Sequence, residues 1–245
     1  ISGGCGTIGT AIAREFLREG SEVILLDNNK NNIKNFPKDL IDKIKIIKCD
    51  VTKKKEIRKA MNIIVKIFGG LDIVISNAGK AFQGQIAEVD ENTMHESYKV
   101  NFFSHQHLSQ ESVRIFKEQK IGGLVLFNIS KQSVNPGKNF GPYGLPKSST
   151  LFLMKQYALE YGKYGIRFNG INADRIQSGI LNHKLITARA KARNLLPKDY
   201  MQGNLLKKEI KAKDVARAFL LQAKLTKTTG NIITVDGGNI EASLR

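Results

Sequence analysis

Short apolar runs rich in β-branched residues alternate along this chain with amphipathic stretches of helical period, and this alternation constrains the fold most. The predicted strands cover residues 23–26, 44–47, 71–75, 124–129, 166–171 and 231–235, and all six read as buried on both faces. The predicted helices cover residues 7–19, 56–68, 92–116, 143–161 and 213–225. Strand alternating with helix predicts parallel βαβ units. We therefore expect an α/β fold, a three-layer doubly wound parallel sheet.

The start of the chain conflicts with this architecture. In such a fold the first Gly-rich turn follows a central strand, yet only Ile1 and Ser2 precede Gly3. A parallel sheet without its central strand leaves backbone groups unpaired. With no repeat or linker in between, we expect residues 1–245 to form a single domain whose first strand is largely missing, an N-terminally incomplete fragment of a longer chain.

Composition bounds the remaining possibilities. The sequence has no apolar run long enough for a membrane helix and no opening signal peptide, so we expect a cytoplasmic protein. Cys5 and Cys49 are too few for a disulfide framework or a thiolate metal site, so we expect two reduced, buried residues and no metal. The net charge of +17 is spread over almost every segment, which favours a solvated Lys-rich surface over a nucleic-acid site.

A Gly-rich turn opens the chain. Gly3, Gly4, Gly6 and Gly9 lead into the amphipathic helix predicted for residues 7–19. Such a turn lets the backbone approach a pyrophosphate, whose charge the free N–H groups of the helix start can hold. We place Gly3, Thr7, Ile8 and Gly9 at this site.

Asp27 ends the next predicted strand, about 20 residues after the turn. A carboxylate there hydrogen-bonds the hydroxyls of an adenosine ribose, and the alternative is a helix cap or turn former. Neither Asn28 nor Gly6 is basic, so no cation awaits a 2′-phosphate, and NAD is favoured over NADP. Asp50 with Val51, and Asn77-Ala78-Gly79, follow two further strands and suit close approach to adenine and ribose.

Tyr143 and Lys147 carry the chemistry that the fold would serve. On a helix their i,i+4 spacing places phenol and ammonium on one face, and a cation there favours phenolate. Ser130, thirteen residues upstream, adds a hydroxyl able to hold a carbonyl or alcohol oxygen. A chance Tyr-x-x-x-Lys pair is the alternative in a Lys-rich chain.

The order of these features resembles the short-chain dehydrogenase/reductase family across the whole chain. The matching features are the Gly-rich turn, Asp27, Asp50-Val51, Asn77-Ala78-Gly79, Asn101, Ser130, Tyr143 and Lys147. The resemblance implies a Rossmann fold with seven parallel strands and an NAD-dependent oxidoreductase that transfers a hydride between nicotinamide and a CH–OH or carbonyl group.

The resemblance also implies a role for each catalytic position. Tyr143 would exchange the proton of the substrate oxygen, and Ser130 would orient that oxygen. Lys147 would bind the nicotinamide ribose and lower the pKa of the phenol, while Asn101 would hold a water that links Lys147 to solvent. Pro146 is tolerable if the helix begins near Tyr143.

Departures from the family pattern narrow the prediction. Thr7 replaces a common glycine, and Asn172-Ala173-Asp174-Arg175 replaces the usual Asn-Pro-Gly. Asp174 and Arg175 either face the substrate, together with Lys131, or form an internal ion network. Ile176 should offer its backbone to the carboxamide, with Ser178 at the position of a common Thr.

Residues 128–147, 172–179 and 190–193 are most similar to one subgroup, the dehydrogenase half of bifunctional class II aldolase/short-chain dehydrogenases of rhamnose-type deoxysugar catabolism. This similarity implies carbohydrate metabolism and a small hydroxyaldehyde such as lactaldehyde, or a sugar-derived polyol or ketose. It also suggests an upstream aldolase domain, although an incomplete gene would explain the missing start equally well.

Two further expectations concern the lid and the assembly. Residues 181–206 lie where this fold carries a substrate lid, and their cations either indicate a polar or anionic substrate or form a solvated helix face. The helix at 143–161 is apolar on more than one side, which predicts a homodimer or homotetramer. The rival from another class is a non-catalytic dinucleotide sensor or nucleic-acid-binding protein on the same fold.

Overall fold

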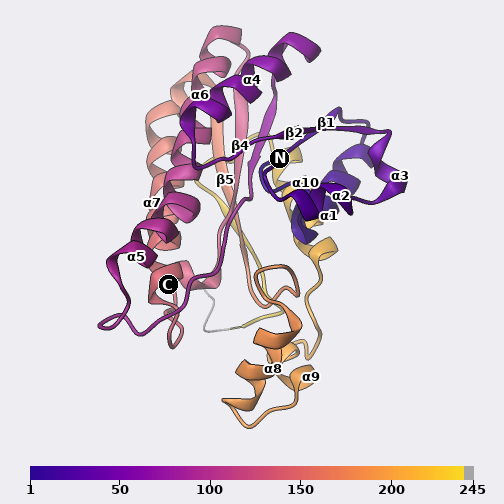
Figure 1. Ribbon diagram of the computed structural model, residues 1–245. Helices are drawn as coiled ribbons and strands as arrows, with labels where there is room; N and C mark the ends of the chain where they lie inside the picture. The colour runs from indigo at the N-terminus through magenta and orange to yellow at the C-terminus, as the bar shows by residue number, and fades with distance from the viewer. Residues whose placement is uncertain (240–245) are drawn as a thin grey trace.

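A parallel β-sheet forms the middle layer of the molecule in the computed structural model, which describes residues 1–239 (Figure 1). The strands are β1 (Val23–Asp27), β2 (Ile44–Lys48), β3 (Ile73–Ser76), β4 (Gly123–Asn128), β5 (Ile166–Ala173) and β6 (Ile232–Val235). One part of the sheet pairs β1 with β2, and the other has the order β3-β4-β5-β6. All pairings are parallel, as the alternation of strands and helices predicts.

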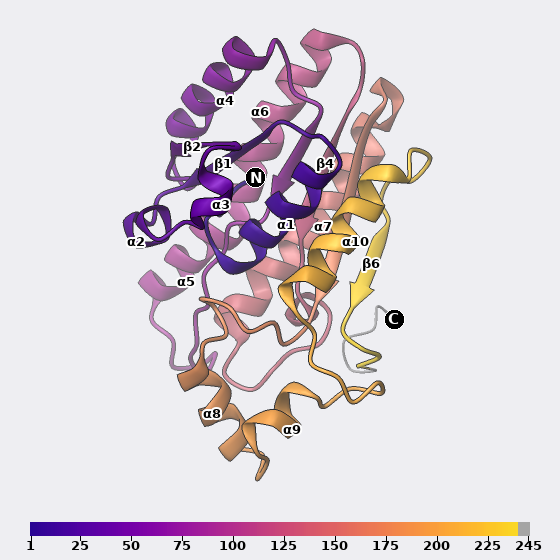
Figure 2. The same ribbon diagram turned by 90° about the vertical axis from the view of Figure 1, so that its right-hand side faces the viewer.

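Helices cover both faces of this sheet. Helices α4 (Lys54–Phe68), α6 (Ser104–Gln119) and α7 (Gly141–Tyr161) lie on one face, and α1 (Thr7–Arg18) and α10 (Ala212–Lys224) lie side by side on the other (Figures 1 and 2). The shorter helices are α2 (Lys30–Lys34), α3 (Lys38–Ile41), α5 (Glu91–Tyr98), α8 (His183–Lys191) and α9 (Pro197–Met201). The expected three-layer doubly wound Rossmann architecture is confirmed.

Ile1 and Ser2 stand at the centre of the sheet, between β1 and β3. The Ser2 N–H donates to the Ile75 carbonyl at 2.9 Å, and the Leu26 N–H donates to the Ile1 carbonyl at 2.8 Å. These two residues join the parts of the sheet, since no strand pairing links β1 directly to β3 within residues 1–239. Next to them, a cavity of about 810 Å³ opens between the amino-terminal ends of β1 and β3.

The two outermost strands correct one prediction. We expected every strand to be buried on both faces, but β2 and β6 contain no fully buried residue, whereas β4 and β5 are almost wholly buried. The reason is their position at the sheet edges, where neighbouring helices cover only part of each strand. Exposed Lys45 and Lys48 on β2 are typical of an edge strand that resists further pairing.

Two helices also differ in detail from the prediction. The helix expected at 92–116 is interrupted by a π-helical turn, Lys99–Phe103, between α5 and α6. Helix α7 begins at Gly141 rather than at Tyr143, so Pro146 is its sixth residue and not part of the first turn. The first-turn explanation for Pro146 is therefore wrong, and Pro142 is the proline at the helix start.

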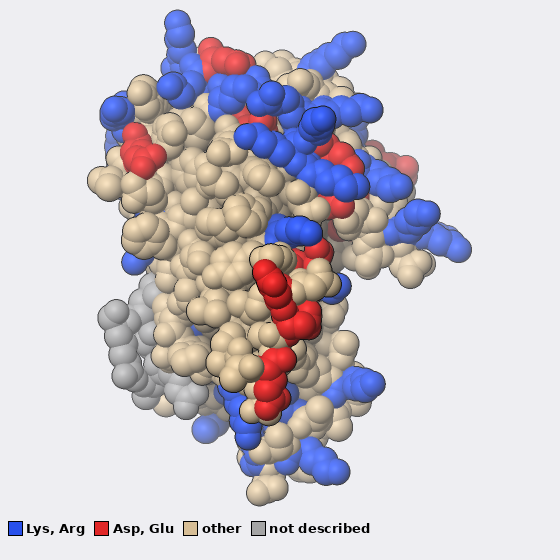
Figure 3. Space-filling model, turned by 60° about the vertical axis from the view of Figure 1, so that its left-hand side comes forward, with Lys and Arg blue, Asp and Glu red and all other residues tan. Residues whose placement is uncertain are grey.

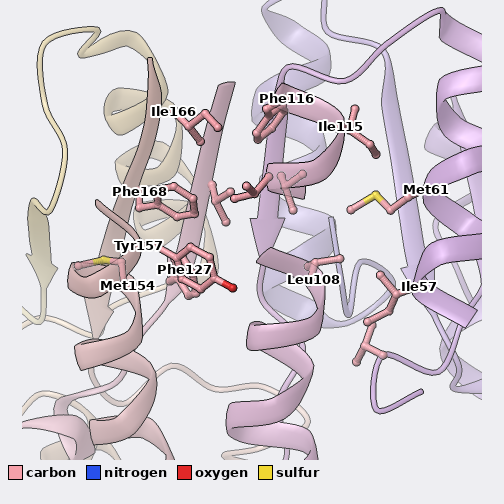
Figure 4. Close-up of a cluster of buried hydrophobic side chains, with 14 of the residues drawn as sticks. Ile57, Met61, Leu108, Ile115, Phe116, Phe127, Met154, Tyr157, Ile166 and Phe168 are labelled. Atoms are coloured by element: carbon pink, nitrogen blue, oxygen red, sulfur yellow. The ribbon is translucent and has the colours of Figure 1, made fainter. Parts of the chain in front are cut away.

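The larger apolar core lies between the sheet and helices α4, α6 and α7 (Figure 4). Phe116 of α6 is 1% exposed, and its ring covers the start of β4 so closely that a Cβ on Gly123 would lie 2.5 Å from it. A second core joins α1 and α10 to the opposite face of the sheet. A small third cluster, from Leu181 to Met201, holds α8 against α9.

We predict that Phe116→Ala lowers the free energy of unfolding by about 3–5 kcal/mol, because truncation leaves a cavity in a packed core. Ile121, five residues later and 76% exposed, is the matched control, and Ile121→Ala should change stability by less than about 0.5 kcal/mol. Urea denaturation followed by circular dichroism measures both variants. Equal losses in the two variants would contradict this assignment of the core.

Candidate active site

The residues predicted to hold a cofactor follow the carboxyl ends of the strands. The Gly-rich turn enters α1 at Thr7, and Gly3 adopts φ +60°, a conformation that disfavours other residues. A Cβ on Gly9 would lie 2.7 Å from Gly4 Cα, so only glycine lets the helix start pack on the turn. Together, the turn and the free N–H groups of α1 form a cradle suited to a phosphate.

Asp27 connects the end of β1 to this turn. Its Oδ2 accepts a hydrogen bond from the Cys5 N–H at 3.0 Å, and its Oδ1 accepts one from the Asn29 N–H at 2.9 Å. The carboxylate is therefore buried and oriented beside the turn. Burial and then the charge of Asp27 raise the pKa of the Cys5 thiol to about 12, so the thiol stays protonated. Cys5 and Cys49 are both free and buried, as predicted.

Asn77 joins three chain segments at the next strand ends. Its Nδ2 donates to the carbonyls of Ser2 and Gly3 at 3.0 and 3.2 Å, and its Oδ1 accepts from Asn128 Nδ2 at 2.8 Å. The Ala78 N–H donates to Ser2 Oγ at 3.1 Å. The turn, β3 and β4 are thus locked together by one amide side chain.

Asp50 and Val51 lie farther along the same edge. The Asp50 Oδ1 accepts hydrogen bonds from the Thr52 N–H and hydroxyl at 3.0 and 2.8 Å, and Val51 is buried in the core. In this structure the Asp50 carboxylate orders its own loop and forms an ion pair with Lys53 at 3.6 Å. The loop places Val51 beyond the end of β2.

Tyr143, Ser130 and Lys147 come together at the start of α7. Burial raises the pKa of Tyr143 to about 12, and hydrogen bonding to Ser130 opposes this shift only in part. Burial also lowers the pKa of Lys147 to about 8. The Lys147 Nζ lies 5.9 Å from the centre of the Tyr143 ring. In the protein alone, burial therefore outweighs the hydrogen bond with Ser130, and the phenol stays protonated at neutral pH.

The loop at Gly79 lies close to two predicted residues, Asn101 and Lys147. A Cβ on Gly79 would lie 3.2 Å from Asn101 Oδ1 and 3.8 Å from Lys147 Nζ, so this loop passes close to both side chains. Asn101 is fully buried in the π-helical turn, where its amide hydrogen-bonds the backbone N–H and carbonyl of Lys80 and the hydroxyl of Ser97. A π-turn at such a position is a frequent mark of a functional site.

His105 also contacts this centre and was not foreseen. Its Nδ1 lies 2.6 Å from Ser76 Oγ, and its Nε2 lies 3.5 Å from Lys147 Nζ. The sequence gives no sign of this contact, because His105 and Lys147 are 42 residues apart and lie on different helices. No short motif relates two such positions.

A cavity of about 100 Å³ lies in front of Tyr143. Eight predicted residues line it: Ile8, Ser130, Lys131, Tyr143, Asp174, Arg175, Ile176 and Ser178. Helices α8 and α9 contribute Leu185, Arg189 and Tyr200, so the segment expected as a lid does border this cavity. The other predicted residues, among them Lys147, Asn101 and Asp27, do not line this cavity.

Asp174 forms the internal ion network that was one of the two alternatives. Its Oδ2 lies 3.5 Å from Lys131 Nζ and 3.4 Å from Arg175 Nε, and it accepts a hydrogen bond from Asn239 at 2.6 Å. Arg175 also donates to the carbonyls of Tyr200 and Gly203, in a left-handed conformation at φ +52°. These hydrogen bonds and ion pairs hold the Arg175 backbone in the left-handed region, which is unfavourable for residues other than glycine.

Ile176 and Ser178 form the wall of the cavity after Arg175. Ile176 is buried, and the Ser178 Oγ accepts a hydrogen bond from the Leu181 N–H at 3.3 Å. Within residues 1–239, no group of His, Cys, Asp and Glu side chains is arranged to hold a metal ion. No helix in that same range is long and apolar enough to cross a membrane.

Comparison with known proteins identifies the family. Residues 4–239 match the family described as enoyl-(acyl carrier protein) reductase. The chain belongs to this family of short-chain dehydrogenase/reductase oxidoreductases. It is 32% identical over 251 residues to YuxG, an uncharacterized oxidoreductase of Bacillus subtilis (strain 168), and the match covers 97% of this chain. The chain spans only 36% of the length of YuxG.

Solved structures confirm the fold. The 3-ketoacyl-(acyl-carrier-protein) reductase of Brucella melitensis, complexed with NADH, superposes with a TM-score of 0.85 at 20% identity over 97% of this chain and 96% of that chain. ElxO with NADP bound gives a TM-score of 0.85 at 22% identity, with the same two coverages. Proteins of this fold therefore bind either form of the nicotinamide dinucleotide.

We predict that Lys147→Met raises the free energy of unfolding at pH 7 by up to about 3 kcal/mol. Burial lowers the pKa of Lys147 from its ordinary value of 10.5 to about 8 in the folded chain. At pH 7 the ammonium group is therefore charged in both states, and folding costs free energy because it removes this charge from water. Between pH 8 and 10.5 the unfolded wild type holds a proton that the folded state has lost. The stability of the wild type should therefore rise over that range relative to the Lys147→Met variant.

Urea denaturation at a series of pH values measures this difference, with Lys163→Met, on an exposed side chain, as control. A Lys147→Met variant less stable than wild type at every pH would contradict the buried, uncompensated charge.

Proposed function

We propose that this chain is an NAD-dependent oxidoreductase that transfers a hydride between nicotinamide and a CH–OH or carbonyl carbon of a small polar substrate. The observation that carries the proposal is the meeting of Ser130, Tyr143 and Lys147 beside a small cavity, at the edge of the sheet that carries the Gly-rich turn.

The residues present fit a nicotinamide dinucleotide. The cradle of Gly3, Thr7, Ile8 and Gly9 suits the pyrophosphate, and Asp27 suits the adenosine ribose. Asp50, Val51 and Asn77-Ala78-Gly79 extend this surface, and Ile176 and Ser178 close it beside the cavity. The dinucleotide, when bound, supplies or accepts the hydride.

The side chains divide the remaining chemistry. Tyr143 exchanges a proton with the substrate oxygen, and Ser130 holds that oxygen by a hydrogen bond. Lys147 contacts the nicotinamide ribose and places its positive charge behind the phenol, which favours loss of the phenol proton. Asn101 holds a water that links Lys147 to solvent. Because burial raises the pKa of Tyr143 to about 12, the phenol is protonated at neutral pH and can donate its proton to a carbonyl oxygen.

Tyr143→Phe should lower kcat at least ~10²-fold, because it removes the proton donor and acceptor. The affinity for NADH should change little, since the ring and the buried Lys147 remain. Turnover of a panel of hydroxyaldehydes, deoxysugars and polyols, with NADH fluorescence titration in parallel, tests this expectation. Tyr164→Phe, at a partly exposed tyrosine remote from the cavity, is the matched control. Undiminished turnover by Tyr143→Phe would refute the assignment.

NAD should bind more tightly than NADP. The buried Asp27 carboxylate faces the position of a 2′-phosphate, and two like charges would repel. Asp27→Asn keeps the side-chain shape but removes the charge, so we expect the affinity for NADH to fall about tenfold and the preference over NADPH to shrink. Fluorescence titration measures both, with Asp42→Asn on the exposed surface as control. A wild-type preference for NADPH would contradict the proposal.

The charges around the cavity support a small, polar or anionic substrate. Lys131, Arg175 and Arg189 line it, and Asp174 is the one carboxylate among its lining residues within 1–239. A hydroxyaldehyde such as lactaldehyde, or a sugar-derived polyol or ketose, fits this polarity. Lys131, Asp174 and Arg175 are the proposed substrate contacts, although Asp174 and Arg175 also serve the internal network.

We further propose that the chain is one dehydrogenase domain of a bifunctional class II aldolase/short-chain dehydrogenase of rhamnose-type metabolism. The similarity to the much longer YuxG supports a larger parent protein.

A homodimer or homotetramer is the proposed assembly. Helix α7 exposes Leu145, Phe152 and Leu159, of which Leu159 is 79% exposed, and Phe103 lies exposed at the start of α6. Figure 3 shows a broad face without charged side chains on the side of the molecule where α6 and α7 lie. An apolar face of this kind is typical of an interface between subunits.

A further inference from the structure

His105 is buried between four elements of the fold. Its exposed fraction is 0%. From α6, its Nδ1 lies 2.6 Å from Ser76 Oγ at the end of β3, and its Nε2 lies 3.5 Å from Lys147 Nζ on α7. The ring also stacks on Phe127 of β4, with 6.0 Å between centroids. These contacts hold the imidazole in one orientation, with one nitrogen toward Lys147.

Lys147 determines which nitrogen of this ring carries the proton. Burial, and then the charge of Lys147, hold the pKa of His105 well below its usual range, so the ring is neutral with one N–H. An ammonium group has donors only and needs a lone pair opposite it. The lone pair therefore lies on Nε2, and the Nδ1–H donates to Ser76 Oγ. The imidazole is thus an acceptor for Lys147.

Neutral acceptors alone surround the ammonium group in the described part of the chain. Its second contact is the Asn128 carbonyl, to which Nζ donates at 2.9 Å. No ion pair to Lys147 forms within residues 1–239. The groups that face Lys147 and His105 are Ser76 of β3, Phe127 and Asn128 of β4, Gly79 and Asn101 of the neighbouring loop and turn, and Tyr143 of α7. Of these, only Tyr143 titrates.

We propose that His105 is a positioning residue for Lys147, whose ammonium it holds in place, through the Nε2 lone pair, for the nicotinamide ribose. The proposal rests on the proposed function, in which Lys147 contacts that ribose. Without the acceptor, Lys147 loses its proton at a lower pH, because the remaining carbonyl offsets less of the cost of burial. The donor to the ribose and the cation behind Tyr143 are then weakened together.

Two variants of similar size separate this role from packing. In His105→Gln the side-chain amide reaches the position of Nε2 and its oxygen accepts from Lys147. The shorter side chain of His105→Asn reaches Ser76 but not Lys147. Titration with NADH at pH values from about 6.5 to 9.5 gives the pH at which the affinity falls. We expect that midpoint to follow the Lys147 pKa of about 8 in the wild type and in His105→Gln, and to lie about one unit lower in His105→Asn.

His107 provides the matched control on the same helix. Partial burial, and then the charge of Lys54 rather than Lys147, lower the pKa of His107, so His107→Asn should leave the midpoint unchanged. A His105→Asn variant that binds NADH with the wild-type midpoint would overturn the proposal. An equally lowered midpoint in both His105 variants would also overturn the proposal. The packing of the imidazole ring, and not the acceptor for Lys147, would then determine the pH at which NADH affinity falls.

A second readout needs no dinucleotide and separates this inference from the proposed function. If the wild type binds NADH at no pH, the proposed function fails, and the pH dependence of unfolding still reports the pKa of Lys147. The rise in stability with pH should then begin about one unit lower in His105→Asn than in His105→Gln. Coincident curves for those two variants would refute the role of His105.

Discussion

The site depends on the contacts that hold the buried ammonium group of Lys147. Lys147 is 2% exposed, and within the described residues its contacts are the Asn128 carbonyl and the imidazole of His105. Such a charge is costly to bury, and folding tolerates it only because the sheet delivers these acceptors at one point. The result is a cation that water screens little, 5.9 Å from the centre of the Tyr143 ring.

Small polar side chains at the strand ends make that arrangement possible. Asn77 binds the Gly-rich turn to β3 and β4, while Asp27 binds the same turn to β1. The backbone that would surround a dinucleotide is therefore held by side-chain hydrogen bonds as well as by strand pairing. A substitution at either residue acts on cofactor binding through the shape of the turn as well as through lost contacts.

The sequence predicted the layers, the strand order along the chain and the grouping of Ser130, Tyr143 and Lys147, because periodicity and motif spacing are local signals. It did not predict that β2 and β6 are partly exposed, since edge position depends on the order of strands in space. It could not predict how deeply Tyr143 and Lys147 are buried, because burial cannot be read from an i,i+4 pair. His105 was missed because its partners, Ser76 and Lys147, are distant in sequence. For Arg175 the sequence left open a contact with substrate or an internal network. In the structure Arg175 lines the cavity and also donates a hydrogen bond to the Tyr200 carbonyl.

A crystal structure of the protein with NADH would test the role of Lys147 most directly. We expect the nicotinamide ribose within hydrogen-bonding distance of Tyr143 Oη and Lys147 Nζ, the pyrophosphate on the turn of Gly3 to Gly9, and the adenosine ribose at Asp27. A dinucleotide bound away from Lys147, or with its adenosine end at Tyr143, would contradict it.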